Sequence, residues 1–194
     1  MVAHERRRRL HGDRIRMAAA REEGGMDQER EFLRKVELLA DFDGGELDAF
    51  GASMVATEFG PGQLILEEGQ PNRALHIVRE GRVRVSRRVE DSDVILCDLS
   101  AGRTFGELSI LEEGHAIATL RAIPKTTILS ISMNDLNRML RDSPATAAKF
   151  WKAIAIDLRG RLVQTNDVVR TYFEVNRALV ENPTFREAYA MVSR

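Results

Sequence analysis

The amino-acid sequence predicts a mainly β fold of the α+β class: a jelly roll, or double-stranded β-helix, with N-terminal helices before it and one long C-terminal helix after it. From Val55 to Ser132, short strand-like runs are separated by glycine and proline turns. On both sides of this region, apolar residues instead recur at intervals of three and four, as in amphipathic helices. About eight short strands at this spacing are typical of a barrel or jelly roll.

The composition is that of an ordinary globular protein. The chain has 194 residues, of which 43% are hydrophobic and 30% are charged, and its net charge is −1. This length fits one domain with extensions. No apolar run approaches the roughly 18 residues of a membrane span. Cys97 is the single cysteine; it stands in an apolar run, so we expect it in the core, and a chain without disulfides fits the reducing cytoplasm.

Residues 1–25 differ from the rest of the chain. The first 21 residues hold seven arginines against two acidic residues, a side-chain charge of +5, which leaves −6 for residues 22–194. We expect a basic, disordered tail. The functional alternative is an arm that binds nucleic acid or anionic lipid. A third interpretation is that translation starts at Met26, because codons for the preceding Arg-Glu-Glu-Gly-Gly can resemble a bacterial ribosome-binding site.

The two N-terminal helices are predicted from their apolar spacing. A first helix is expected from Asp27, and a turn from Asp41 to Gly45 separates it from a second, shorter helix. The apolar positions of the first helix are Phe32, Leu33, Val36, Leu39 and Ala40, and those of the second are Leu47, Phe50 and Met54.

The β region divides into runs that end at turn residues. The expected strands are residues 63–66, 73–78, 82–86, 94–99 and 126–131, with another in residues 118–123. Glu80-Gly81 is expected to be a hairpin turn. Polar and apolar residues alternate strictly in residues 82–86. Val83 and Val85 are therefore expected to face inward, and Arg82 and Arg84 outward.

The residues expected to bind a ligand lie in the stretch from Gly102 to Ala122. Gly102 and Gly106 flank a turn that leads into Glu107, and a second turn at Gly114 leads back into a strand. A helical turn beginning near Glu107 would leave backbone N–H groups free at its N-terminus, where they favour an anion such as a phosphate. The carboxylate itself would repel a phosphate, but it can accept a hydrogen bond from a neutral donor such as a ribose hydroxyl.

This stretch resembles the phosphate-binding cassette of the cyclic nucleotide-binding domain family, in which Phe-Gly-Glu-Leu precedes Arg-Ser-Ala-Thr-Val. The matching residues are Phe105, Gly106, Glu107, Leu108, Ala118, Thr119 and Leu120. The resemblance covers about residues 28–175. It implies that cyclic AMP or cyclic GMP binds in the roll, with its ribose on Glu107 and its phosphate on N–H groups near Leu108, Ala118 and Thr119.

Two positions depart from the family pattern. Ala116 stands where the family has the arginine that grips the cyclic phosphate, and Ile117 replaces the small hydroxyl residue. A charge-assisted bidentate pair contributes about 1.5–3 kcal/mol. Its loss is expected to weaken nucleotide binding by roughly 10–150-fold.

A long helix is predicted after the roll. Ser143 and Pro144 are an N-cap and a first helical residue, and no proline follows until Pro183, so the helix is expected to run to about Glu181. A heptad repeat fits it and predicts a parallel homodimer. Its a positions are Ala148, Ala155, Leu162, Val169 and Asn176, and its d positions are Trp151, Leu158, Thr165, Tyr172 and Leu179. Asparagine at an a position favours two strands in register.

Part of this helix resembles the corresponding helix of catabolite activator proteins, in which a threonine and the next polar residue contact the ligand base across the dimer. The resemblance implies that Thr165 and Asn166 bind the base. The alternative is that Thr165 is a small core residue and Asn166 is solvated. Those activators continue into a helix-turn-helix domain. Residues 182–194 are too few for one, so no sequence-specific DNA binding is expected, although residues 184–192 are expected to form a last short helix.

The sequence contains no recognisable motif of catalytic or metal-binding residues. The four histidines lack metal-ligand spacing, and no phosphate-binding loop or nucleophile motif is found. We therefore expect neither an enzyme nor a bound metal. The predicted divisions are a tail (1–25), a cyclic nucleotide-binding-like roll (26–142), the long helix (143–181) and a C-terminal segment (182–194).

The sequence leaves two functions open. The first is a stand-alone sensor that binds a cyclic nucleotide and signals to an effector protein. The second is a dimeric scaffold of the same fold that has lost its ligand, which the residues Ala116 and Ile117 favour.

Overall fold

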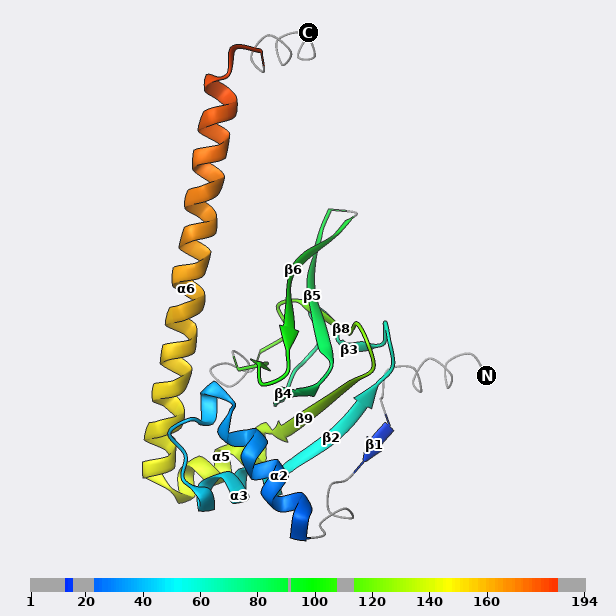
Figure 1. Cartoon of the computed structure of the whole chain (residues 1–194), viewed down its shortest axis with the longest axis vertical. Coiled ribbons are helices and arrows are strands. Elements are labelled where there is room, and N and C mark those ends of the chain that lie inside the picture. The colour runs from blue at the N-terminus through cyan, green and yellow to red at the C-terminus, as the bar shows by residue number, and fades with distance from the viewer. Residues whose placement is uncertain (1–12, 16–22, 91, 108–113, 185–194) are drawn as a thin grey trace, which may run out of the picture. The chain divides into compact units, whose positions relative to one another are not determined.

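The computed structural model of the protein describes residues 13–15, 23–90, 92–107 and 114–184. The chain divides into two compact units, Met1–Ala153 and Ile154–Arg194. The first unit contains all the described strands, the N-terminal helices and the beginning of the long helix α6 (Pro144–Glu181), whose remainder belongs to the second unit (Figure 1).

Two antiparallel sheets form the jelly roll, which confirms the predicted fold class. The strand order is β1-β2-β9-β4-β7 in the first sheet and β3-β8-β5-β6 in the second. The strands are β1 (Asp13–Ile15), β2 (Met54–Phe59), β3 (Leu64–Leu66), β4 (Ala74–Glu80), β5 (Arg82–Val89), β6 (Ser92–Ser100), β7 (Thr104–Phe105), β8 (Thr119–Ala122) and β9 (Thr126–Ser132). Because the chain passes repeatedly between the two sheets, their inward side chains meet in one core.

The core of the roll is apolar and draws on both sheets. It is a cluster of eight buried residues: Phe59, Val78, Val83, Phe105, Ala118, Leu120, Ala122 and Ile128. Val83 is buried as its alternation predicts, and Val85 packs against the cluster from the next inward position. A bulge between Val85 and Ser86 then shifts the register of β5.

The sequence predicted a hairpin turn at Glu80-Gly81, and this prediction is wrong. The chain instead passes there from one sheet to the other. Strand β4 pairs with β9 and β7, whereas β5 pairs with β6 and β8. Gly81 has a φ of 85°. A Cβ atom there would lie 2.5 Å from the Lys125 carbonyl oxygen. Glycine is therefore required where the chain crosses closely over the start of β9.

The first helix is shorter than the apolar spacing predicted. Helix α2 (Glu23–Arg34) ends before Val36, and a 3-10 helix follows at Glu37–Leu39. Helix α3 (Gly44–Ala52) begins at a capping box formed by Asp43 and Glu46. Met54, which the spacing placed in the second helix, is instead the first residue of β2.

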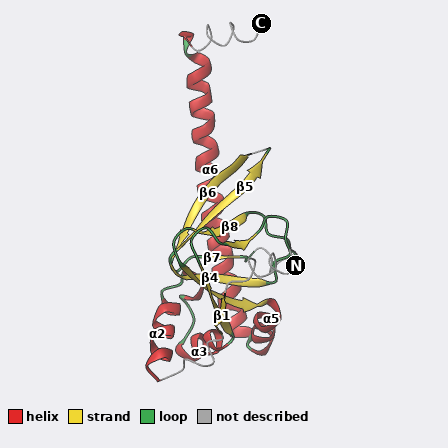
Figure 2. Ribbon diagram, turned by 90° about the vertical axis from the view of Figure 1, so that its right-hand side faces the viewer, coloured by secondary structure: helices red, strands yellow, loops and turns green. Residues whose placement is uncertain are grey.

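Helices α2, α3 and α5 (Met133–Asp142) lie together at one end of the roll (Figure 2). Arg30 of α2 forms two hydrogen bonds to the Asp48 carboxylate of α3. Arg79 of β4 lies 2.7 Å from the Glu29 carboxylate of α2. Burial raises the pKa of Glu29, and the charge of Arg79 opposes that effect. These two ion pairs attach α2 to both its helical and its β neighbours.

Part of the predicted tail is ordered. Residues 13–15 form β1, which pairs antiparallel with β2 in the register Asp13↔Glu58 to Ile15↔Ala56. The expected disorder therefore does not extend to these residues. Arg6 to Arg9 and Arg21 lie outside the described residues.

Cys97 is exposed, which corrects its predicted place in the core. It belongs to β6, one of the two edge strands of the four-stranded sheet. Its neighbours Val94, Ile95 and Leu96 are also exposed. An uninterrupted apolar run is typical of a strand buried on both faces, but an edge position leaves this one open to solvent.

Helix α6 begins as predicted. The Thr146 N–H donates to the Ser143 hydroxyl, which acts as the N-cap, and Pro144 is the first helical residue. Thr146 and Lys149 both bind the Glu46 carboxylate of α3, each at 2.7 Å. Phe150 is fully buried. These contacts fix the first turns of α6 within the first unit.

The second unit, Ile154–Arg194, contains α6 from Ile154 onward, and most of the apolar side chains on this part of the helix are exposed. The helix ends at Glu181, where the sequence placed its end. The helix predicted over residues 184–192 lies almost wholly outside the described residues. Within the described part of the chain, no helix combines the length and the apolar character that a membrane crossing requires.

Candidate ligand-binding site

Gly106 follows β7 in a backbone conformation that favours glycine, with a φ of 84°. A Cβ atom there would lie 2.5 Å from Asn72 Nδ2 and 2.7 Å from the Ala74 carbonyl oxygen. Strand β7 pairs with β4 through Phe105 and His76. Glycine therefore lets this turn pass close to β4, and this close approach fixes the start of the next residue, Glu107.

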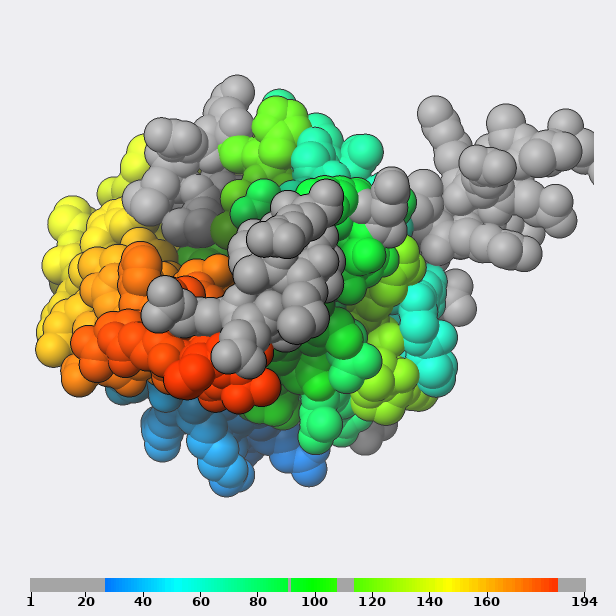
Figure 3. Space-filling view, turned by 90° about the horizontal axis from the view of Figure 1, so that it is seen from above, coloured from blue at the N-terminus to red at the C-terminus, as the bar shows by residue number. Residues whose placement is uncertain are grey.

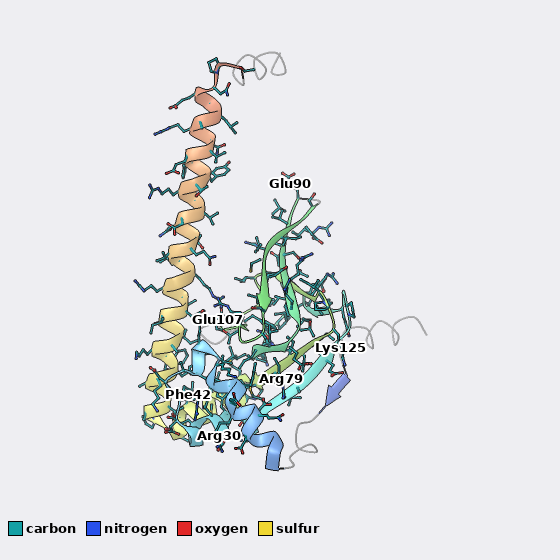
Figure 4. The ribbon with its side chains drawn as sticks, in the orientation of Figure 1. Arg30, Phe42, Arg79, Glu90, Glu107 and Lys125 are labelled. Carbon is teal, nitrogen blue, oxygen red and sulfur yellow. The ribbon has the colours of Figure 1, made fainter. Side chains whose placement is uncertain are left out.

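Glu107 is buried in the first unit, with 3% of its surface exposed (Figure 4). An ionised carboxylate is only a hydrogen-bond acceptor, and burying it is costly unless donors surround it. A carboxylate held inside a roll is therefore suited to a neutral donor such as a hydroxyl. Contact between Glu107 and a ribose stays a prediction.

Three hydrogen-bonded side chains, those of Asn72, His76 and Ser130, support the turn at Gly106. His76 Nε2 lies 3.1 Å from Asn72 Oδ1, and His76 Nδ1 lies 2.7 Å from the Ser130 hydroxyl. The ring also stacks on Phe105 at a centroid distance of 4.7 Å. Desolvation lowers the pKa of His76 to about 4. The imidazole is therefore neutral at physiological pH, and it joins β4 to β9 beneath Gly106.

This lowered pKa predicts a loss of stability in acid. Between pH 6.5 and 4, the unfolded chain binds a proton at His76 that the folded chain does not, so stability falls as the pH falls through this window. The full effect is roughly 3–4 kcal/mol, because each unit of pKa shift corresponds to about 1.4 kcal/mol. In urea titrations at pH 7 and near pH 4.5, His76→Gln should lose less stability than the unmodified protein. His115→Gln, which removes an imidazole from the turn before β8, is the control, and an unchanged pH dependence in His76→Gln would refute the assignment.

The second half of the cassette pairs with the turn that follows β3. The Gly69 N–H donates to the Ala116 carbonyl, and the Ala116 N–H donates to the Gln70 carbonyl, both at 2.8 Å. The Asn72 N–H donates to the Gly114 carbonyl at 3.2 Å. The backbone N–H of Ala116 is therefore already used and is not available to a phosphate.

The side chains on this segment point in different directions. Ala116 and Ala118 are buried, at 8% and 5% exposure, whereas Ile117 is 63% exposed. The Thr119 hydroxyl accepts a hydrogen bond from the Glu68 N–H at 3.2 Å. Of the two positions that depart from the family pattern, Ala116 therefore faces inward and Ile117 faces solvent.

Leu108 lies outside the described residues, as does the helical turn that the sequence predicted after Glu107. Thr165 and Asn166 belong to the second unit and are exposed on α6. The Thr165 hydroxyl donates to the Arg161 carbonyl at 2.9 Å, a common bond within a helix. Binding of a base by Thr165 and Asn166 stays a prediction.

Sequence reasoning did not single out Asn72, His76 or Glu68. The Glu68 carboxylate accepts from the Arg88 N–H and from Arg87 Nε, both at 3.1 Å, and the Arg88 bond is the main cause of its lowered pKa. These groups fix the turn that pairs with Ala116. Their partners are distant in sequence, so spacing alone carried no signal.

Comparison with known proteins agrees with this geometry. Residues 56–143 match the family model described as "Cyclic nucleotide-binding domain". A cyclic nucleotide-gated channel of Caenorhabditis elegans is 32% identical over 120 residues, which are 59% of this chain and 16% of the channel. The match thus spans a small part of that channel. A cAMP-activated global transcriptional regulator of Mycobacterium tuberculosis is 24% identical over 130 residues, which are 66% of this chain and 58% of the regulator.

Two solved structures share the fold. The N-terminal domain of a transcriptional regulator from Streptomyces coelicolor is 29% identical, with a TM-score of 0.62, and the match covers 71% of this chain and 94% of that one. A cyclic nucleotide-binding domain from Methylobacillus flagellatus is 21% identical, with a TM-score of 0.68, over 77% of this chain and 84% of that one.

Proposed function

The chain carries a domain of the cyclic nucleotide-binding family over residues 56–143, and we propose that this domain senses cyclic AMP or cyclic GMP and signals to a partner protein. Domains of this family are typically regulatory modules without catalysis. The observation that carries the proposal is the burial of the Glu107 carboxylate directly after the left-handed Gly106. In this position the carboxylate can accept a hydrogen bond from a ribose hydroxyl.

The phosphate of the nucleotide lies, in this proposal, against backbone N–H groups near Leu108, Ala118 and Thr119. These groups are neutral donors, so they hold an anion less firmly than an arginine does. Because Ala116 supplies no charge, we expect affinity to be roughly 10–150-fold below that of a site with the arginine. Ligand specificity then depends on the ribose contact more than on the phosphate contact.

The base contacts Thr165 and Asn166 of α6 in this proposal, and α6 joins two copies of the chain. A ligand that touches both roll and helix binds one arrangement of the two better than another, and so shifts their equilibrium. The effector protein would recognise that shift. The proposed dimer seam consists of the d and a residues Trp151, Leu158, Leu162, Thr165, Val169 and Tyr172.

A ligand-free scaffold is the second candidate, and a specific observation favours it. Ala116 is buried at the position of the phosphate-binding arginine, and an apolar side chain, Ile117, stands exposed beside it. In a scaffold, Glu107 serves only to hold the turn after β7. The two candidates differ in whether a nucleotide stabilises the native protein.

The test replaces the carboxylate and nothing else. With cyclic AMP or cyclic GMP at about 100 times its Kd, the native protein should gain about 2.7 kcal/mol of stability, measured as a rise in its thermal midpoint. Glu107→Gln removes the acceptor charge and should abolish most of this gain. If the gain persists in Glu107→Gln, the ribose assignment is wrong.

A matched control separates this effect from a general change of charge. Glu90 is exposed at the end of the β5–β6 ribbon, away from Glu107 (Figure 4). Glu90→Gln makes the same chemical change and should leave the nucleotide-dependent rise intact. Absence of any rise in the native protein, at millimolar concentrations of either nucleotide, would favour the scaffold.

A further inference from the structure

Three arginines share the outward face of the four-stranded sheet. Val83 of β5 and Leu120 of β8 are buried in the core of the roll. Successive residues of a strand point to opposite faces of a sheet, so Arg82, Arg84 and Arg121 point outward. Arg82 and Arg121 are exposed, and the Arg84 side chain is 43% exposed. Atoms of β5 and β6, green in Figure 3, lie at the surface in that view.

The three arginines are close neighbours in the strand register. Arg84 of β5 lies directly opposite Arg121 of β8. Residues in such a pair have Cβ atoms about 4.5–5.5 Å apart. Arg82 stands two residues before Arg84 on the same face, about 7 Å away. Like charges directly opposite each other destabilise a sheet, so this arrangement lowers the stability of the protein when no anion is bound.

One carboxylate faces these arginines in the strand pairs that the structure describes. Asp98 of β6 lies opposite Arg84 and accepts hydrogen bonds from its Nε at 3.0 Å and its Nη2 at 3.2 Å. The hydrogen bond from Arg84 is the main cause of the lowered pKa of Asp98, and the charge of Arg82 adds to it. The partner of Arg82 on β6 is Ser100. Three arginines and one aspartate leave this group, which we call the arginine face, with a net charge of +2.

The arginine face is too small for a nucleic acid or a membrane. Nucleic-acid binding through charge alone depends on many phosphate contacts, of the order of 6–10. Attraction to an anionic lipid surface takes a cluster of roughly 4–8 basic residues. Residues 22–194 carry a side-chain charge of −6, so the surroundings of the face add no general attraction for a polyanion. A local carboxylate partner fits this charge distribution better.

The neighbouring surface favours a protein partner. Val94, Ile95 and Leu96 of β6 are between 43% and 57% exposed, on the strand that also carries Asp98. Charged groups at the rim of an apolar patch are typical of protein interfaces. Sites for small molecules are concave, whereas the arginines stand on an open sheet face.

We propose that the arginine face binds an extended acidic segment of a partner protein, with carboxylates at alternate residues. Alternate side chains of an extended chain lie about 7 Å apart on one side, which is the spacing of Arg82 and Arg84. A guanidinium donates two parallel hydrogen bonds to a carboxylate, so each arginine can hold one acidic side chain. The effector of the proposed function can supply this segment. The docking needs no nucleotide, so it can hold even if the chain binds neither cyclic AMP nor cyclic GMP.

Peptide binding tests the proposal on the full chain without nucleotide. The probe is a labelled peptide of alternating glutamate and threonine, measured by fluorescence anisotropy at low salt. Arg82→Gln with Arg121→Gln should weaken its binding by roughly tenfold, because two exposed charge contacts are lost. The control is Arg73→Gln with Arg141→Gln, which removes two exposed arginines before β4 and on α5. This control should weaken binding little.

The other outcomes of this experiment would overturn the proposal. Equal weakening in both double variants would mean that net charge alone attracts the peptide. Equal binding of a peptide with glutamine in place of glutamate would show that carboxylates are not recognised. Oligothymidylate or anionic vesicles that bind as tightly, and lose binding in the same variant, would assign the face to anions in general. Absence of binding at low salt would also contradict the proposal.

Thermal unfolding tests the repulsion on which the proposal depends. Arg121→Gln removes the charge opposite Arg84 and should raise the thermal midpoint by roughly 1–3 °C at low salt. The gain should shrink as added salt screens the charges. Arg141→Gln makes the same change on α5 and should leave the midpoint nearly unchanged. If Arg121→Gln gives no rise, the arginine face is not destabilised without an anion, and the proposal fails.

Discussion

Ala116→Arg is expected to raise the affinity of the protein for cyclic AMP or cyclic GMP by roughly 10–150-fold. The reason is that a guanidinium at this position can form the charge-assisted pair with the cyclic phosphate, which contributes about 1.5–3 kcal/mol. Ala116 is 8% exposed, so the new side chain is partly desolvated in the free protein. We therefore also expect Ala116→Arg to lower the thermal midpoint without nucleotide and to recover it with nucleotide. Calorimetric titration and thermal unfolding measure these two effects.

The neighbouring residue supplies the control for this substitution. Ile117 is 63% exposed, so Ile117→Arg adds the same charge one residue away but directs it to solvent. It should change nucleotide affinity little, because exposed charges interact weakly through water. Equal gains in Ala116→Arg and Ile117→Arg would mean that net charge, and not a phosphate site, explains the result. No gain in either variant would refute the placement of the phosphate beside residue 116.

Gly106→Ala is expected to destabilise the protein by about 3 kcal/mol, through two combined effects. Its φ of 84° is unfavourable for alanine, and the new Cβ would lie 2.5 Å from Asn72 Nδ2 and 2.7 Å from the Ala74 carbonyl oxygen. Relief of this overlap moves the turn away from β4 and shifts Glu107. Urea-induced unfolding should show the loss of stability, and nucleotide binding should weaken in the same variant.

Gly102→Ala isolates the contribution of the close contact. Gly102 has the same φ of 84°, but a Cβ atom there would meet no atom within 4 Å beyond its immediate neighbours in the chain. We expect Gly102→Ala to cost only about 1 kcal/mol, from backbone conformation alone. If the two variants are equally destabilised, the approach of Gly106 to β4 does not matter to stability, and the description of this turn is wrong.

Much of the fold could be predicted because its signals are local. Turn glycines divide the strands, and Ser143 with Pro144 determines where α6 begins. The errors arose where a local signal has two structural meanings. A left-handed glycine at position 81 suits a hairpin and also a corner between sheets. An apolar run around Cys97 suits a buried strand, but an exposed edge strand has the same composition.

The candidate site could be predicted only in part. Gly106 and Glu107 were found through a short motif, and the structure places them in one turn. The support for that turn could not be found in this way. His76 bonds to Ser130, which is 54 residues away, and neither residue stands in a recognisable pattern. Contacts of this kind depend on which strands become neighbours, and a single sequence does not state that directly.

Isothermal titration of the unmodified full chain with cyclic AMP and cyclic GMP tests the proposed sensor most directly. We predict saturable binding of at least one nucleotide in the micromolar range, despite alanine at position 116. We also predict that this binding is lost in Glu107→Gln. Absence of heat and of any thermal stabilisation at millimolar nucleotide would contradict the sensor, and would leave the chain as a scaffold with this fold.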